Sequence, residues 1–159
     1  MPGRLARDIK QSKPFFSQRL EVYFNLLRTT ALLTQTAVEM LKNHDLSETQ
    51  YNVLRILRGA ATTPDGGLPC SEVGARLITH DPDVTRLLDR LEKRDLVQRA
   101  RGDTDRRVVL VRITPAGTAL LEACDLDHRL TEAFATRFAG LSSDDCKNLI
   151  TLLENLRQS

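Results

Sequence analysis

The sequence predicts a mainly α-helical chain that carries one small β-hairpin. Three observations predict this fold class. Apolar residues recur at helical spacing before residue 95 and again after residue 114. Between these regions the spacing changes to the alternation that is typical of strands. A polar stretch at residues 102–106 separates two alternating runs and has the composition of a hairpin tip.

The N-terminal part predicts an arm followed by one long helix. Residues 1–16 mix charged residues with two prolines, so we expect an extended arm that Phe15 and Phe16 anchor. Over residues 17–44 the apolar side chains form a helical stripe of about seven turns. One small domain would struggle to cover so long a stripe, which therefore predicts a partner along its length.

A second helix has a clear start and stop. Ser47 and Gln50 form a capping box before an apolar helical pattern that continues to residues 59–61. Residues 62–67 are rich in threonine, proline and glycine, which predicts a loop.

The next segment has the element order of a winged helix-turn-helix. A short helix is expected from about residue 70 to residue 78. Asp81 as N-cap and Pro82 as first helical residue predict a second helix close behind it. Alternating runs at residues 96–101 and 108–113 then predict the hairpin. In a winged helix-turn-helix, the second of these helices enters the major groove of DNA.

Two further helices are expected at the C-terminal end. Thr114 and Pro115 cap and start a helix that ends near Gly140. Ser142 with Asp145 caps a last helix with its own apolar stripe.

Composition excludes several classes of protein. The 159 residues are 41% hydrophobic and 28% charged, which suits one globular core. The net charge of +2 excludes a polybasic tail and an acidic disordered chain. Apolar runs of four residues or fewer predict no membrane span. The start of the sequence has no apolar signal region, so we expect a cytoplasmic protein.

No pattern of chemistry-bearing residues predicts an enzyme, a metal site or a cofactor. The cysteines Cys70, Cys124 and Cys146 are widely spaced, and Cys124 falls on the apolar side of its helix, so we expect it in the core. The three histidines are scattered, and neither a phosphate-binding glycine loop nor a nucleophile elbow is present.

Positive charge gathers around the predicted hairpin. Between residues 99 and 112, five arginines stand against two aspartates, a net charge of +3. This density favours an anionic partner, and the alternative is a solvated strand pair of alternating charge. The arginines are Arg99, Arg101, Arg106, Arg107 and Arg112, and the aspartates are Asp103 and Asp105.

Two stretches, one in the second helix of the pair and one in the hairpin, have a characteristic sequence. Residues 84–92 read VTRLLDRLE, and residues 105–117 read DRRVVLVRITPAG. These stretches resemble the MarR family, the multiple-antibiotic-resistance regulators of bacteria. The second stretch fits the family's D-x-R-x-x-x-V-x-L-T wing signature, with Ile113 in place of leucine. The resemblance covers about residues 17–157.

The resemblance implies a sequence-specific DNA-binding transcriptional regulator, a repressor that a small-molecule effector releases, with no cofactor. It also implies a homodimer in which the first and last helices interlock and the winged modules straddle an inverted-repeat operator. We therefore expect residues 1–46 to form the arm and dimerisation helix. Residues 47–114 would form the DNA-binding region, and residues 115–159 the C-terminal dimerisation helices of one intertwined domain.

The sequence departs from the family pattern at two turns. Asp95 stands where relatives often have glycine after the second helix, and aspartate tolerates the left-handed conformation better than most residues. Pro69 stands where a serine or threonine cap usually begins the short helix, so a ragged start is expected there.

Four candidate DNA-binding residues lie on the second helix of the pair. Arg86 and Arg90 are four residues apart on one face beside Thr85, from which phosphates and base edges are within reach. The alternative for Arg90 is an ion pair within the helix. Asp83, like Asp81, suits the helix dipole but repels phosphates, which predicts that base contact there is either selective or weak.

Three more candidates lie at the hairpin tip. Arg107 is expected to enter the minor groove, while Asp105 holds the tip in shape and Arg106 adds positive charge. The alternative is a local surface ion pair, worth roughly 0 to 1 kcal/mol.

Tyr23 and Phe24 on the long helix, with Tyr51 on the second helix, are candidate effector-binding residues, although they could equally be core. The resemblance implies a small aromatic or phenolic acid as effector. Two other functions stay open: a winged-helix protein–protein interaction module without DNA binding, and an unrecognised hydrolase. The basic tip favours DNA.

Overall fold

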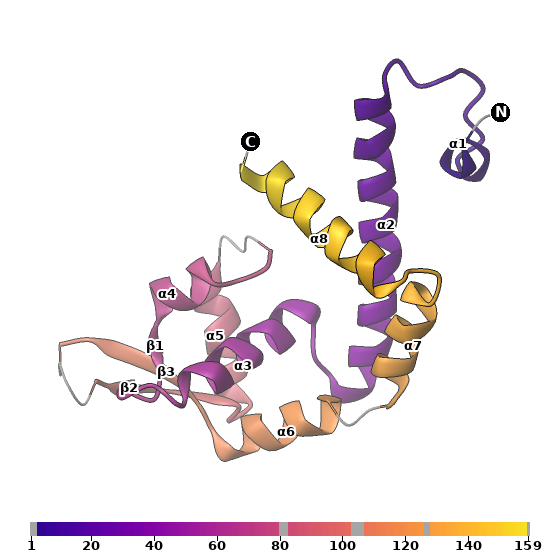
Figure 1. Cartoon of the computed structure of the whole chain (residues 1–159). Coiled ribbons are helices and arrows are strands. Elements are labelled where there is room, and N and C mark those ends of the chain that lie inside the picture. The colour runs from indigo at the N-terminus through magenta and orange to yellow at the C-terminus, as the bar shows by residue number, and fades with distance from the viewer. Residues whose placement is uncertain (1–2, 80–82, 103–106, 126–127, 159) are drawn as a thin grey trace. The chain divides into compact units, whose positions relative to one another are not determined.

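The computed structural model describes residues 3–79, 83–102, 107–125 and 128–158. The chain has two compact units, residues 1–48 and residues 49–159. The described part of the first unit is helical, and the second unit combines helices with a small sheet (Figure 1).

The first unit is dominated by one long helix. It contains α1 (Arg4–Asp8), α2 (Gln18–Leu41) and the 3₁₀ helix η1 (Lys42–His44). Ser17 caps α2, because its Oγ accepts a hydrogen bond of 3.2 Å from the backbone N–H of Leu20. The helix predicted for residues 17–44 is therefore confirmed, with its last turn tightened to a 3₁₀ helix.

The N-terminal arm is not extended throughout, which corrects the prediction. Residues Arg4–Asp8 form α1, in which Leu5 is buried. Burial of this apolar side chain stabilises the helix, which is too short to show a periodic pattern in the sequence. Phe15 anchors the next segment, with its ring centroid 5.9 Å from that of Phe24. Phe16 is 97% exposed, so only one of the two predicted anchors packs.

The remaining elements follow the predicted order, with one additional strand and with one predicted helix divided into two. The helices are α3 (Glu48–Ala60), α4 (Cys70–Ala75), α5 (Val84–Lys93), α6 (Pro115–Asp125), α7 (His128–Phe138) and α8 (Ser143–Gln158). The strands are β1 (Leu68–Pro69), β2 (Val97–Arg101) and β3 (Val109–Ile113).

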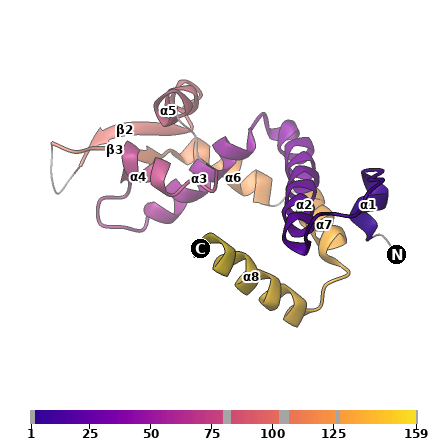
Figure 2. The same ribbon diagram turned by 90° about the horizontal axis from the view of Figure 1, so that it is seen from above.

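The sheet is antiparallel, with the strand order β1-β3-β2. The predicted hairpin is confirmed, because Val97 pairs with Ile113 at its base and Arg101 pairs with Val109 near its tip. The sequence did not predict β1, since two residues are too few to show alternation. The hairpin reaches beyond the helices of its unit in both views (Figures 1 and 2).

The core of the second unit joins the helices to the sheet. Its central side chains are at most 1% exposed, and they include apolar positions that helical spacing selects on α3, α5 and α6. Cys124 is also fully buried, so its predicted place in the core is confirmed. The other central residues are Val53, Leu54, Leu57, Val73, Leu87, Leu88, Leu91, Val97, Val111 and Leu121.

A tight junction fixes the hairpin to α5 and α6. Asp95 adopts the left-handed conformation at φ 56°, as the sequence predicted for the position that often holds glycine. The Thr114 hydroxyl donates to the Asp95 carbonyl at 2.6 Å and accepts from the Gly117 N–H at 3.0 Å. A Cβ at position 117 would lie 2.1 Å from the Leu96 carbonyl oxygen, so this approach requires glycine.

The helix of residues 84–93 begins later than predicted. Its N-cap is Asp83, whose Oδ1 accepts a hydrogen bond of 3.2 Å from the Arg86 N–H, and its first residue is Val84. Asp81 and Pro82, which the sequence favoured as cap and first residue, lie outside the described residues. Asp83 takes the cap because it directly precedes the first residue of the apolar pattern.

The other helix bounds differ in detail from the prediction. α4 ends at Ala75 instead of residue 78, and Pro69 precedes it without a side-chain cap. The single helix predicted for residues 115–140 is two helices, α6 and α7.

The capping box of α8 is confirmed. The Asp145 N–H donates to Ser142 Oγ at 3.2 Å, and the Ser142 N–H donates to Asp145 Oδ2 at 3.0 Å.

Candidate nucleic-acid interface

The helix α5 has one apolar face and one basic face. Leu87, Leu88 and Leu91 are fully buried against the rest of the unit. The exposed side carries residues at helical spacings of four and three, which places them on one face. These are Arg86, Arg90 and Lys93, with the exposed Thr85 beside them.

Asp83 positions Arg86 at the start of this face. Besides capping the helix, the Asp83 carboxylate lies 3.1 Å from Nε of Arg86, whose side chain is 83% exposed. The aspartate that the sequence marked as a repulsive charge is therefore held by the helix N-terminus and by an arginine. Its local role is to order the first turn.

A shallow hollow of about 430 Å³ follows the exposed side of α5. Of the residues that the structure describes, none forms an ion pair with Arg90 or Lys93, so both cations face solvent. Sequence reasoning missed Lys93, although its position seven residues after Arg86 could have placed it on the same face. The lining residues are Asp83, Arg86, Asp89, Arg90 and Lys93.

The arginines of the hairpin have different environments. Arg107 lies two residues before the start of β3, and it is exposed. Near the tip of the hairpin, the Gly102 N–H donates a hydrogen bond of 2.9 Å to the Val108 carbonyl. Asp105 and Arg106, the other predicted tip residues, lie outside the described residues. Arg112 donates through Nε to the Asp65 carbonyl at 3.1 Å, so it fastens the loop before β1.

Arg99 is held by acids of α5. Its Nη2 lies 2.7 Å from Oδ1 of Asp89, and its Nη1 binds Oε2 of Glu92. Partial burial disfavours the charged guanidinium, but the bonds to Asp89 and Glu92 outweigh it and raise the pKa of Arg99. The predicted basic cluster is thus divided, and Arg99 and Arg112 act within the fold.

The three candidate effector residues are placed in different units. In the first unit, Tyr23 and Phe24 contact edge to face with centroids 5.4 Å apart, and both are exposed. In the second unit, the Tyr51 hydroxyl donates to Asp125 Oδ1 at 2.9 Å. The guanidinium of Arg55 lies 5.8 Å from the centre of the Tyr51 ring.

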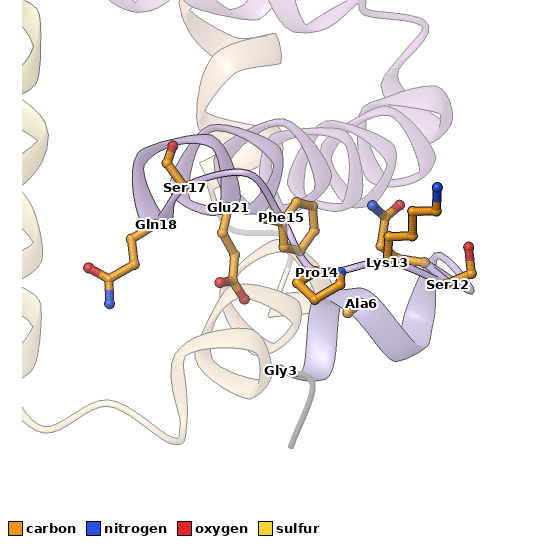
Figure 3. Close-up of a pocket in the computed structure, with 10 residues that line it drawn as sticks. Gly3, Ala6, Ser12, Lys13, Pro14, Phe15, Ser17, Gln18 and Glu21 are labelled. Atoms are coloured by element: carbon orange, nitrogen blue, oxygen red, sulfur yellow. The ribbon is translucent and has the colours of Figure 1, made fainter.

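The first unit contains a hollow that the sequence did not predict. It measures about 560 Å³ and lies between α1 and the beginning of α2 (Figure 3). Pro14 and Phe15 supply apolar surface, while Gln18 and Glu21 supply polar groups. None of the three predicted effector residues lines this hollow, although Phe15 packs on Phe24.

The described residues offer no metal site built from three or more histidines, cysteines or acids. Within the same ranges, no helix has the length and apolar character that a bilayer span requires.

A short helix and a basic second helix, followed by a β-hairpin, define a winged helix-turn-helix protein of the DNA-binding type. The model of the MarR family matches residues 46–109. The multiple antibiotic resistance protein MarR of Salmonella typhimurium is 30% identical over an alignment of 139 residues, and the alignment covers 81% of this chain and 88% of that protein. The chain belongs to the MarR family and is a transcriptional regulator.

Solved structures share the fold. A mutant MarR from Escherichia coli complexed with operator DNA has a TM-score of 0.74 and 25% identity, covering 91% of this chain and 99% of that one. CouR from Rhodococcus jostii RHA1, bound to p-coumaroyl-CoA, has a TM-score of 0.75 and 24% identity, covering 89% of this chain and 95% of that one.

Proposed function

We propose that this regulator binds an inverted-repeat operator as a homodimer and represses transcription until a small effector releases it. The main observation in favour of DNA binding is the basic face of α5, which lies next to the hairpin. The complex of the related Escherichia coli protein with operator DNA supports it. We expect the regulator to act in the cytoplasm and to have no enzymatic activity.

Each DNA-contacting element has its own role in this proposal. Thr85, Arg86 and Arg90 reach base edges and phosphates of the major groove from α5. Asp83 holds the Arg86 side chain and the first turn in place. The tip residues Asp105, Arg106 and Arg107 form the wing, with Arg107 directed to the minor groove.

Exposed apolar faces support the dimer. On α8, four apolar side chains are 40–65% exposed. A continuous apolar surface of this kind is rarely left exposed to solvent in a monomeric soluble protein. On α2, six large apolar side chains are similarly exposed. We propose that a second copy covers both faces, with residues 1–46 and 115–159 as dimerisation regions and residues 47–114 as the DNA-binding region. The residues are Leu149, Ile150, Leu152 and Leu156 on α8, and Leu20, Val22, Tyr23, Phe24, Leu27 and Val38 on α2.

An aromatic or phenolic acid is the proposed effector, with Tyr23, Phe24 and Tyr51 as its candidate contacts. CouR, which has the same fold, binds p-coumaroyl-CoA, so this fold can accommodate an aromatic acyl group. Thermal-shift measurements with small aromatic carboxylates check the proposal, since a ligand that binds the folded state raises the melting temperature. No shift at millimolar concentration would contradict this effector class.

Selection of bound fragments from sheared genomic DNA with the purified protein tests the function. We expect enrichment of an inverted repeat whose half-sites are about one helical turn apart. Affinity should fall steeply as salt rises, because phosphate contacts release counterions. Recovery of random fragments, or binding that does not respond to salt, would favour the alternative of a protein–protein interaction module.

A further inference from the structure

One arginine of the hairpin joins the strand β2 to the helix α5. Arg99 binds Asp89 and Glu92 through separate nitrogens of its guanidinium, with Nη2 2.7 Å from Oδ1 of Asp89. Its backbone N–H also donates to Oε1 of Glu92 at 3.0 Å. The planar guanidinium suits this arrangement, because it presents several donors in a fixed geometry. A strand residue therefore holds two carboxylates that lie one turn apart on the helix.

These carboxylates lie beside the basic face of α5. Asp89 lines the hollow that Arg86, Arg90 and Lys93 also line. Within the described part of the chain, Arg99 is the one ion-pair partner of both Asp89 and Glu92. Without it, two unpaired negative charges would stand beside the three cations of this face. Phosphates approaching the helix would then meet a much weaker positive field.

We propose that Arg99 is a positioning residue for operator recognition, an inference that rests on the proposed function. Arg99 fixes α5 relative to β2, and it neutralises the two acids beside the basic face. It does so without contacting DNA, because its side chain is only 27% exposed and its guanidinium is already engaged by carboxylates. The sequence interpretation that grouped Arg99 with the anion-binding arginines is thereby revised.

The two parts of this role respond differently to mutation. Arg99→Gln removes the cation and leaves both carboxylates charged, so it should weaken DNA binding most at low salt, where repulsion is least screened. Adding Asp89→Asn and Glu92→Gln removes the repulsive charges without restoring the ion pairs. A purely structural role would give no recovery in that triple variant.

The experiment compares operator affinities by fluorescence anisotropy at several salt concentrations, using the operator selected with the wild-type protein. We expect Arg99→Gln to weaken binding on the order of tenfold at low salt, comparable with the loss of one arginine contact, and less at high salt. The triple variant should recover most of that loss. Arg137→Gln on α7 is the matched control, because Arg137 is exposed and the substitution changes the net charge equally.

Circular dichroism first establishes that each variant is folded. If Arg99→Gln unfolds, Arg99→Lys takes its place: it keeps the charge, loses the two-pronged geometry and should weaken binding about threefold, a fraction of one arginine contact. Binding by Arg99→Gln equal to that by Arg137→Gln would overturn the inference while leaving the function intact, and so would a triple variant no better than Arg99→Gln. If the wild-type protein selects no DNA, the proposed function fails first and this inference fails with it.

Discussion

The Tyr51 hydroxyl donates a hydrogen bond of 2.9 Å to Oδ1 of Asp125, which joins α3 to the last residue of α6. Arg58 donates to the other carboxylate oxygen at 2.6 Å. Burial and the bond to Asp125 raise the pKa of Tyr51. Partial burial would also raise the pKa of Asp125, but the hydrogen bonds from Arg58 and Tyr51 outweigh it and lower that pKa.

Tyr51 should make folding stability sensitive to alkaline pH. Because its pKa is raised in the folded protein, the folded state keeps a proton that the unfolded chain releases near the ordinary value of 10.0. The stabilisation is fully present below that pH and is lost as the pH rises through the folded pKa. Urea unfolding from about pH 8 to about pH 11 should therefore show a weaker pH dependence for Tyr51→Phe than for wild type.

At neutral pH, Tyr51→Phe should cost about 0.5 kcal/mol, because the hydrogen bond is partly screened by solvent. Tyr23→Phe is the matched control, since Tyr23 is 54% exposed and its described contact is a ring contact with Phe24. The same loss of pH dependence in both variants would contradict the assignment to Tyr51.

The last helix should lose its dimer contact through one substitution. Leu153 is half-buried within the chain and belongs to the apolar stripe of α8. Leu153→Glu would place an unpaired charge in the proposed interface, at a cost of roughly 3 kcal/mol or more. Sedimentation should show a monomer, and operator binding should be lost with the dimer. Gln158→Glu adds the same charge at an exposed position and should leave the dimer intact. A wild-type monomer at micromolar concentration would refute the dimer itself.

Periodicity predicted most elements of the fold, although not α1 and β1, and it did not predict the side-chain partners. The change of spacing at Leu96 indicated the hairpin, because burial on one face of a strand repeats every two residues. The pairing of Arg99 with Asp89 could not be predicted, since it depends on the register between a strand and a helix and leaves no periodic signal. The break in the helix predicted for residues 115–140 was missed for a related reason: apolar spacing continued on both sides of it.

The cap of α5 can be separated from its ion pair by two substitutions. Asp83→Ala should destabilise the protein by about 1 kcal/mol, because the Arg86 N–H loses its acceptor. Asp83→Ser keeps a capping oxygen and should retain most of that stability, while it removes the negative charge beside Arg86. Asp83→Ser should therefore bind non-specific DNA more tightly than wild type. Equal melting temperatures for the two variants would show that the cap contributes nothing.

The first turn of α5 should determine base preference. Arg86→Ala removes a guanidinium that is 83% exposed on the basic face. If the guanidinium reaches base edges, the preferred central bases of the operator change. If it reaches a phosphate, the slope of log affinity against log salt falls by about one. Selection of binding sites with the variant distinguishes these results, and wild-type behaviour in both measurements would remove Arg86 from the interface.

The wing should contribute affinity through groove shape instead of base identity. Arg107 is exposed beside the tip, and a narrow A·T-rich minor groove concentrates the negative potential that attracts a guanidinium. Arg107→Ala should therefore lose about 1 to 3 kcal/mol of binding free energy on operators with A·T-rich flanks, and much less on operators with G·C-rich flanks. Titration of wild type, Arg107→Ala and Arg86→Ala against both operators and a scrambled duplex measures this difference. If Arg107→Ala binds every duplex as tightly as wild type, the wing does not contact DNA, and the protein–protein alternative becomes the better account of the hairpin.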